Sequence, residues 1–89
     1  MDTRRVMVAL TGRNAVGLDV DTGETLWTLD LPIVPMSFVC YEAMVICTGV
    51  GHVLAVSMSG ELLWHNELPG LGLQQVMLAV PSVTKSGRL

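Results

Sequence analysis

Residues 17–27 read GLDVDTGETLW, and residues 55–64 read AVSMSGELLW, so one pattern occurs twice in a chain of 89 residues. Each stretch places a polar turn between two apolar runs and ends in tryptophan. Gly tolerates positive φ, and Asp, Ser and Thr side chains bond neighbouring backbone groups, so both turns are typical of β-hairpins. These two stretches predict an all-β protein built from repeated hairpins.

The repeat extends beyond the turns. Residues 6–32 and 43–69 match at eleven of twenty-seven positions with an offset of 37, and the only two tryptophans fall in register. A one-residue slip is expected around residues 50 and 58, because residues 55–57 resemble residues 17–19 at an offset of 38. A period of this size is typical of propellers and solenoids. We therefore expect residues 1–89 to form a single domain of two repeat units.

The apolar runs predict short strands with no helix between them. In the first unit the predicted strands are 6–10, 15–20 and 25–31. In the second unit they are 36–42, 43–48, 53–58 and 62–68. A further strand is predicted at about 71–80, where a third unit would begin.

The repeat resembles the blade of pyrroloquinoline-quinone-type β-propellers, whose pattern is close to Ala-x-Asp-x-x-Thr-Gly-x-x-x-Trp. The first unit departs from it only at Gly17, and the second is looser, with Ser57 in the Asp place and one residue fewer in the turn. The resemblance implies that the Trp of one blade packs on the next blade, that Asp and Thr fix the turn, and that the Gly has positive φ. The positions to which it assigns these structural roles are Asp19, Thr22, Gly23, Trp27, Gly60 and Trp64.

The strand count suggests how such blades are completed. Propellers close with four to eight blades of four strands, whereas this chain supplies three strands, then four, then one. Two arrangements remain open: the chain is a piece of a longer propeller, or copies join head to tail. In the second, each copy lends residues 71–80 to the three-stranded blade of the next, and three or four copies close a ring. We expect this homo-oligomer.

The resemblance does not extend to catalysis. The resemblance implies that enzymatic members of the family have a disulfide between adjacent cysteines, a bound calcium ion and a general-base Asp. In this chain Cys40 and Cys47 are not adjacent. No cofactor and no enzymatic activity are therefore expected, and a protein-interaction scaffold is the preferred function. The alternative is a fragment or subunit of a quinone-dependent dehydrogenase-like propeller.

A remote alternative comes from Asp21-Thr22-Gly23, which resembles the catalytic loop of retroviral-type aspartic proteases. Those enzymes are dimers in which two such loops bring carboxylates together. Against this, Glu24 follows where that family has a small residue, and the second unit replaces Asp-Thr with Met58-Ser59. The protease is accordingly not preferred.

Charge and composition limit which partners, cellular location and metal ligands can be expected. The formal net charge is -3, and all five bases lie near the ends of the chain, so no nucleic-acid binding is expected. No residue of 43–60 is charged, but its glycines and serines argue for two strands rather than a membrane span. No targeting segment is predicted, and the few cysteines favour a cytoplasmic protein with reduced thiols. Cys40, Cys47, His52 and His65 lack metal-ligand spacing, so buried thiols, a solvated turn histidine and no metal are expected.

Overall fold

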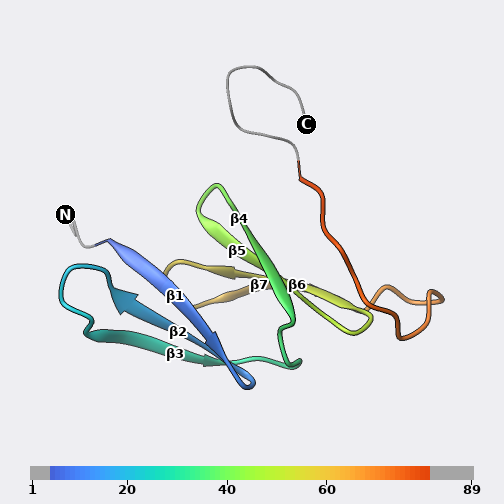
Figure 1. Cartoon of the computed structure of the whole chain (residues 1–89), viewed down its shortest axis with the longest axis horizontal. Coiled ribbons are helices and arrows are strands. Elements are labelled where there is room, and N and C mark those ends of the chain that lie inside the picture. The colour runs from blue at the N-terminus through green and yellow to red at the C-terminus, as the bar shows by residue number, and fades with distance from the viewer. Residues whose placement is uncertain (1–4, 81–89) are drawn as a thin grey trace, which may run out of the picture.

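The computed structural model describes residues 5–80, and this part of the chain contains seven β-strands and no helix (Figure 1). The strands lie within two residues of the ranges predicted for residues 6–68, so the prediction of an all-β fold is confirmed. Their bounds are β1 Val6–Thr11, β2 Asn14–Asp19, β3 Thr25–Asp30, β4 Ser37–Tyr41, β5 Met44–Gly49, β6 His52–Ser57 and β7 Leu62–Asn66.

The strands form two antiparallel sheets. The first has the order β1-β2-β3 and the second the order β4-β5-β6-β7. Every pair of hydrogen-bonded neighbours is also adjacent in sequence, as expected where short polar turns join the strands. Over its described residues the single chain forms no closed barrel or propeller, so the propeller ring stays a proposal.

The two sheets share the same pattern of strand pairing. Val6 lies opposite Asp19 in the first sheet, and Met44 lies opposite Ser57 in the second. Both sheets carry a β-bulge at the same place, between Gly17 and Leu18 and between Ala55 and Val56. β1 and β2 therefore correspond to β5 and β6 at an offset of 38.

This register corrects part of the sequence alignment. Met7 and Met44 match at an offset of 37, but the structural counterpart of Met7 is Val45. In consecutive apolar runs such matches arise in either register, although a shift of one residue turns every side chain to the opposite face. The offset returns to 37 at the tryptophans, because the turn after β6 is one residue shorter than the turn after β2.

The core lies between the two sheets. Its fully buried members include Ala15 of β2, Cys47 of β5 and Leu54 of β6. Trp27 and Leu29 of β3 pack against this cluster from the first sheet. Each sheet thus covers one apolar face of the other, which is how most of this small chain's apolar surface leaves water.

Residues 71–80 form no strand in the single chain, although a strand is predicted there from the sequence. Residues 71–74 bend beside the β5–β6 turn, and the following residues run on toward the C-terminus (Figure 1). Its pairing with another copy stays a prediction. The terminal bases Arg4, Lys85 and Arg88 lie outside the described residues.

Candidate functional site

The turn that joins β2 to β3 is held by the side chains of Asp19 and Thr22. The Asp19 side chain is only 5% exposed, and its Oδ1 accepts a hydrogen bond from the backbone N–H of Asp21 at 2.8 Å. The Thr22 Oγ1 accepts one from the N–H of Glu24 at 3.2 Å. Gly23 closes the turn with a φ of 77°, a conformation that costs glycine little. These contacts fix the direction in which β3 leaves the turn.

The turn that joins β6 to β7 achieves the same result with different residues. The Ser57 Oγ accepts hydrogen bonds from the N–H groups of Ser59 at 3.3 Å and Glu61 at 3.0 Å. Gly60 has a φ of 92°. Ser57 therefore satisfies backbone donors at the place where the first unit has Asp19.

The indole of Trp27 joins the two sheets. Its Nε1–H donates to the carbonyl oxygen of Met58 at 2.9 Å. A Cβ added to Gly60 would lie 2.7 Å from the Trp27 ring, and one added to Gly17 would lie 2.2 Å from it. The ring therefore occupies a slot between a glycine of its own sheet and a glycine of the next, and a side chain at either glycine would displace it.

The counterparts of Trp27 and Gly60 in the two repeat units, Trp64 and Gly23, make no such contact. Trp64 is 44% exposed on β7, where no following sheet of the described chain covers it. Gly23 is the counterpart of Gly60, yet no atom lies within 4 Å of a Cβ built on it. One end of the described chain thus presents an uncovered tryptophan, and the other presents an unoccupied glycine turn.

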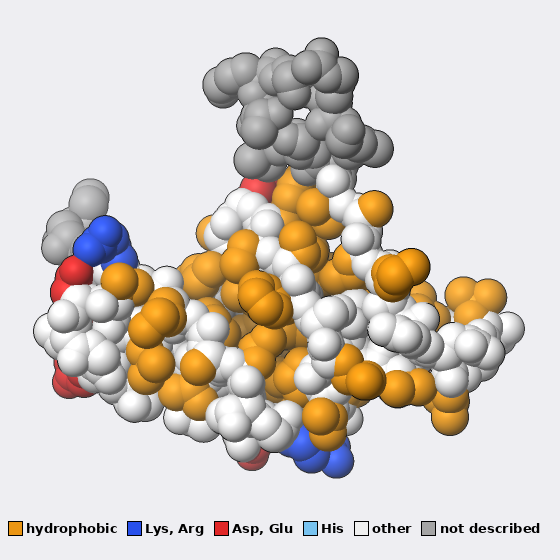
Figure 2. All heavy atoms as spheres, viewed as in Figure 1, with side chains coloured by type: hydrophobic (Ala, Val, Ile, Leu, Met, Phe, Trp, Pro, Cys, Tyr) orange, Lys and Arg blue, Asp and Glu red, His pale blue; other side chains and the backbone are white. Residues whose placement is uncertain are grey.

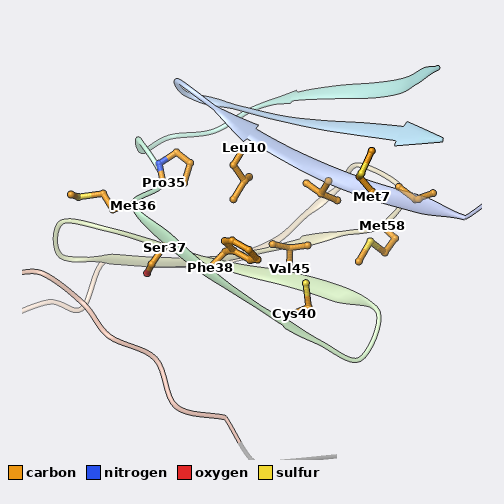
Figure 3. Close-up of a pocket in the computed structure, with 11 residues that line it drawn as sticks. Met7, Leu10, Pro35, Met36, Ser37, Phe38, Cys40, Val45 and Met58 are labelled. Atoms are coloured by element: carbon orange, nitrogen blue, oxygen red, sulfur yellow. The ribbon is translucent and has the colours of Figure 1, made fainter. Parts of the chain in front are cut away.

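A groove lies between β1 and β4, on the side of the molecule where apolar side chains gather (Figure 2). Its volume is about 510 Å³, and no charged residue lines it. Figure 3 shows Leu10 entering the groove from β1, and Phe38 and Cys40 entering it from β4. Phe38 is 62% exposed, although it is the only phenylalanine in the chain. Exposed apolar surface in one place is typical of an interaction site.

The residues of this groove were not identified from the sequence as site residues. The available signal was indirect: β1 begins a three-stranded unit, whereas its counterpart β5 has β4 beside it. A three-stranded sheet beside a four-stranded one implies an unpaired strand edge. Which side chains face that edge depends on how the two sheets pack.

The two cysteines differ, which corrects the expectation that both are buried. Cys47 belongs to the core and is fully buried, whereas Cys40 is exposed in the groove. Burial, with a smaller contribution from neighbouring Cys40, raises the pKa of the Cys47 thiol from 9.0 to about 11. Cys47 is therefore an unreactive core residue, and Cys40 is the accessible thiol of the described chain.

The two histidines are also placed differently from the expectation of a solvated turn histidine. His52 begins β6, His65 lies on β7, and both are partly buried. The Nδ1 of His52 lies 3.0 Å from the Nε2 of His65, and the ring centroids are 5.2 Å apart. These distances fit an N–H···N hydrogen bond along the line between the rings. Among residues 5–80 no cluster of three or more potential metal ligands occurs.

Asp21, the residue on which the protease alternative depends, lies on an exposed turn. Its Oδ1 accepts a hydrogen bond from the Arg5 guanidinium at 2.6 Å, as part of an ion pair in which both side chains are largely exposed. An aspartic protease needs two carboxylates close enough to share a proton. Within the described chain the structurally corresponding turn contains Met58 and Ser59 instead, so a second such carboxylate would have to come from another copy.

No helix long and apolar enough to cross a membrane is found between residues 5 and 80. In the comparisons with known proteins, no family model matches the chain, and no curated protein matches it either.

Proposed function

We propose that this protein is a non-enzymatic β-propeller repeat protein of the pyrroloquinoline-quinone type, whose copies assemble into a closed ring that serves as a protein-interaction scaffold. The observation that carries the proposal is the Trp27 indole, which is seated between Gly17 of its own sheet and Gly60 of the next. A contact of this kind repeated around a ring would join every sheet to its neighbour.

The open ends of the chain support a head-to-tail assembly. Trp64 on the last sheet lacks the contact that Trp27 makes, and Gly23 on the first sheet lacks the contact that Gly60 makes. Placing Trp64 of one copy against Gly23 of the next would pair an indole with a turn glycine, as Trp27 is paired with Gly60, although Trp64 has Ala55 beside it where Trp27 has Gly17. Such an interface is heterologous, so it closes into a ring when the rotation between copies divides a full turn.

The scaffold function is supported by the chemistry of the described side chains. No set of nucleophile, base and oxyanion donor converges at one place. The groove between β1 and β4 is apolar, and its only polar lining side chains are Ser37 and Cys40. A surface of this composition suits binding of a protein segment better than chemical turnover.

Light scattering coupled to size-exclusion chromatography tests the assembly. The expected native mass is three or four times the chain mass of 9.6 kDa, which corresponds to six or eight blades. A chain that remains at 9.6 kDa up to high concentration would contradict the ring.

Titration with pyrroloquinoline quinone and Ca²⁺, followed by the absorbance of the quinone, tests the non-enzymatic part. We expect no saturable change. Saturable binding would instead favour the quinone-dependent dehydrogenase alternative.

A further inference from the structure

We propose that the groove along β1 is a strand-binding site, and that its occupant is the apolar segment 71–80 of a second copy of this chain, added antiparallel to β1. This inference rests on the proposed assembly and specifies its contact. It starts from a difference between the two sheets. β5 has β4 as a hydrogen-bonded partner, whereas β1, its counterpart, has a free edge.

The edge of β1 is unusually accessible for pairing. Its six residues, VMVALT, include no charge and no proline, which are the residues that normally protect an exposed edge from other chains. The groove beside this edge is apolar, and Phe38 stands 62% exposed within it. A strand hydrogen-bonded to β1 would lie over Phe38 and satisfy the unpaired backbone groups of β1. Strand addition of this kind is a common mode of peptide recognition.

The segment 71–80 has the properties that this site requires. Its sequence, LGLQQVMLAV, contains no charged residue, so docking it in the groove would bury no ionised group. From residue 75 to residue 80 exposed and partly covered side chains alternate, as they do along a strand.

The path of the chain supports the same occupant. Before β4 begins, the connection after β3 crosses the β1–β2 turn, where the Leu31 N–H donates to the Arg13 carbonyl at 2.7 Å. After β7 the connection crosses the corresponding β5–β6 turn six residues later than the counterpart of Leu31, and there the Gly51 N–H donates to the Gln74 carbonyl at 2.8 Å. The first connection leads into a strand on the next sheet. The second leads into residues 75–80, for which the described chain has no next sheet.

The repeat also gives a register. Val39 lies opposite Ile46 and Tyr41 lies opposite Met44 in the second sheet. If residues 74–78 follow β4 at the offset of 37 that holds at the tryptophans, and β1 follows β5 at 38, these pairs become Val76 opposite Val8 and Leu78 opposite Val6.

The register also decides which side chains face the groove. Val8 and Leu10 of β1 face the core between the sheets, and Phe38 and Cys40 face it from β4. Val76 and Leu78, paired with alternate residues of β1, would share that face. The geometry therefore places Leu78 of the second copy near Phe38 and Cys40.

Two substitutions separate the two halves of this contact. Leu78→Asp blocks the donated segment, Phe38→Asp blocks the groove, and both residues lie where the single chain does not need them for its core. Each variant alone is expected to lose the ring and to be monomeric in light scattering. An equimolar mixture is expected to form a heterodimer, because the intact segment of the Phe38 variant can enter the intact groove of the Leu78 variant. Val34→Asp, at a 55% exposed residue outside the groove, is the control and should keep the wild-type mass.

A covalent test does not depend on the strength of association. In the Leu78→Cys variant, mild oxidation should join the introduced thiol of one copy to Cys40 of the next and give multimers on a non-reducing gel. The same substitution combined with Cys40→Ser should give none, because Cys47 is buried.

The outcomes distinguish the inference from the proposed function. A wild-type ring that survives both Asp substitutions, or whose Leu78→Cys form gives no Cys40-dependent multimer, overturns the strand-binding site and leaves the assembly. Monomeric wild-type protein overturns both. Binding of a small apolar dye is the third outcome. If the dye binds saturably, if Phe38→Asp abolishes this binding while Leu78→Asp leaves it intact, and if none of these proteins changes its mass, the groove binds a small ligand. That result overturns the proposed occupant.

Discussion

Trp27 and Trp64 end the same motif, yet the structure treats them differently. Trp27 is packed between Gly17 and Gly60 and donates a hydrogen bond to Met58. Trp64 is 44% exposed on the last strand. The difference shows that the motif does not bury its own tryptophan: the indole is covered by the sheet that follows, and the last sheet of the described chain has none. Each repeat unit thus contributes half of a contact.

The largest expected effect separates the two tryptophans. Trp27→Ala should lower the free energy of unfolding by about 3 kcal/mol, since a large ring is removed from a packed slot. Trp64→Ala should change it by less than about 0.5 kcal/mol, as is usual for an exposed position. Urea denaturation at concentrations where the chain is monomeric measures both. Equal losses would show that the two sheets do not differ in the way described.

The glycines opposite these rings should differ next. Gly60→Ala places a methyl group against the Trp27 ring at a residue with a φ of 92°, and overpacking of this kind costs about 1–3 kcal/mol in addition to the backbone strain. The methyl group of Gly23→Ala would meet no atom within 4 Å, so only the backbone strain at its positive φ should lower the stability. Thermal unfolding of the two variants compares them. A Gly23 variant that is as unstable as the Gly60 variant would contradict the claim that nothing packs against Gly23 in the single chain.

The two turns offer a smaller contrast. Asp19→Ala removes a buried carboxylate that holds the Asp21 N–H, and the expected loss is about 2 kcal/mol. Ser57→Ala removes a neutral acceptor from a more exposed turn, and the expected loss is about 1 kcal/mol. Denaturation with urea measures the two losses, and Ser59→Ala is the control for a nearby exposed hydroxyl. If Ser57→Ala is the more damaging change, the turns do not work as described.

The smallest effect concerns the thiols. The pKa of Cys47 is raised to about 11, so the folded protein holds this proton more tightly than the unfolded chain does. Stability from this group is therefore fully present below pH 9.0 and is lost as the pH rises from 9.0 toward 11. At pH 8 a thiol reagent should label Cys40 alone, and Cys40→Ser should abolish labelling of the native protein. Rapid native labelling of Cys47 would show that the core between the sheets is open.

The strands could be predicted from the sequence because local signals determine them. Polar turn residues such as Asp21-Thr22-Gly23 separate apolar runs of strand length, and the tryptophans mark where each unit ends. The correspondence of β1 to β5 could not be predicted, since Met7-Val8 and Met44-Val45 match in a shifted alignment that the backbone does not follow. For β2 and β6 the likeness of residues 55–57 to residues 17–19 did give the offset of 38. Identity counts do not detect the face to which a side chain points.

The site was predictable only in part, for a related reason. Asp19, Thr22 and the two turn glycines fix turns of only a few residues, so their conformations follow from the local sequence. The exposure of Cys40, the pairing of His52 with His65 and the apolar groove depend on which strand lies beside which and on how two sheets stack. Such contacts join residues far apart in the chain, and a single sequence carries little trace of them.

The most direct test of the central claim follows Trp64 itself. In the Trp27→Phe variant Trp64 is the only indole, and its fluorescence reports whether the last sheet is covered. We expect blue-shifted emission that is protected from acrylamide at high protein concentration, with a shift to the red and loss of protection on dilution. Emission that remains solvent-exposed at every concentration, in protein that retains its native mass, would show that no second copy covers this sheet.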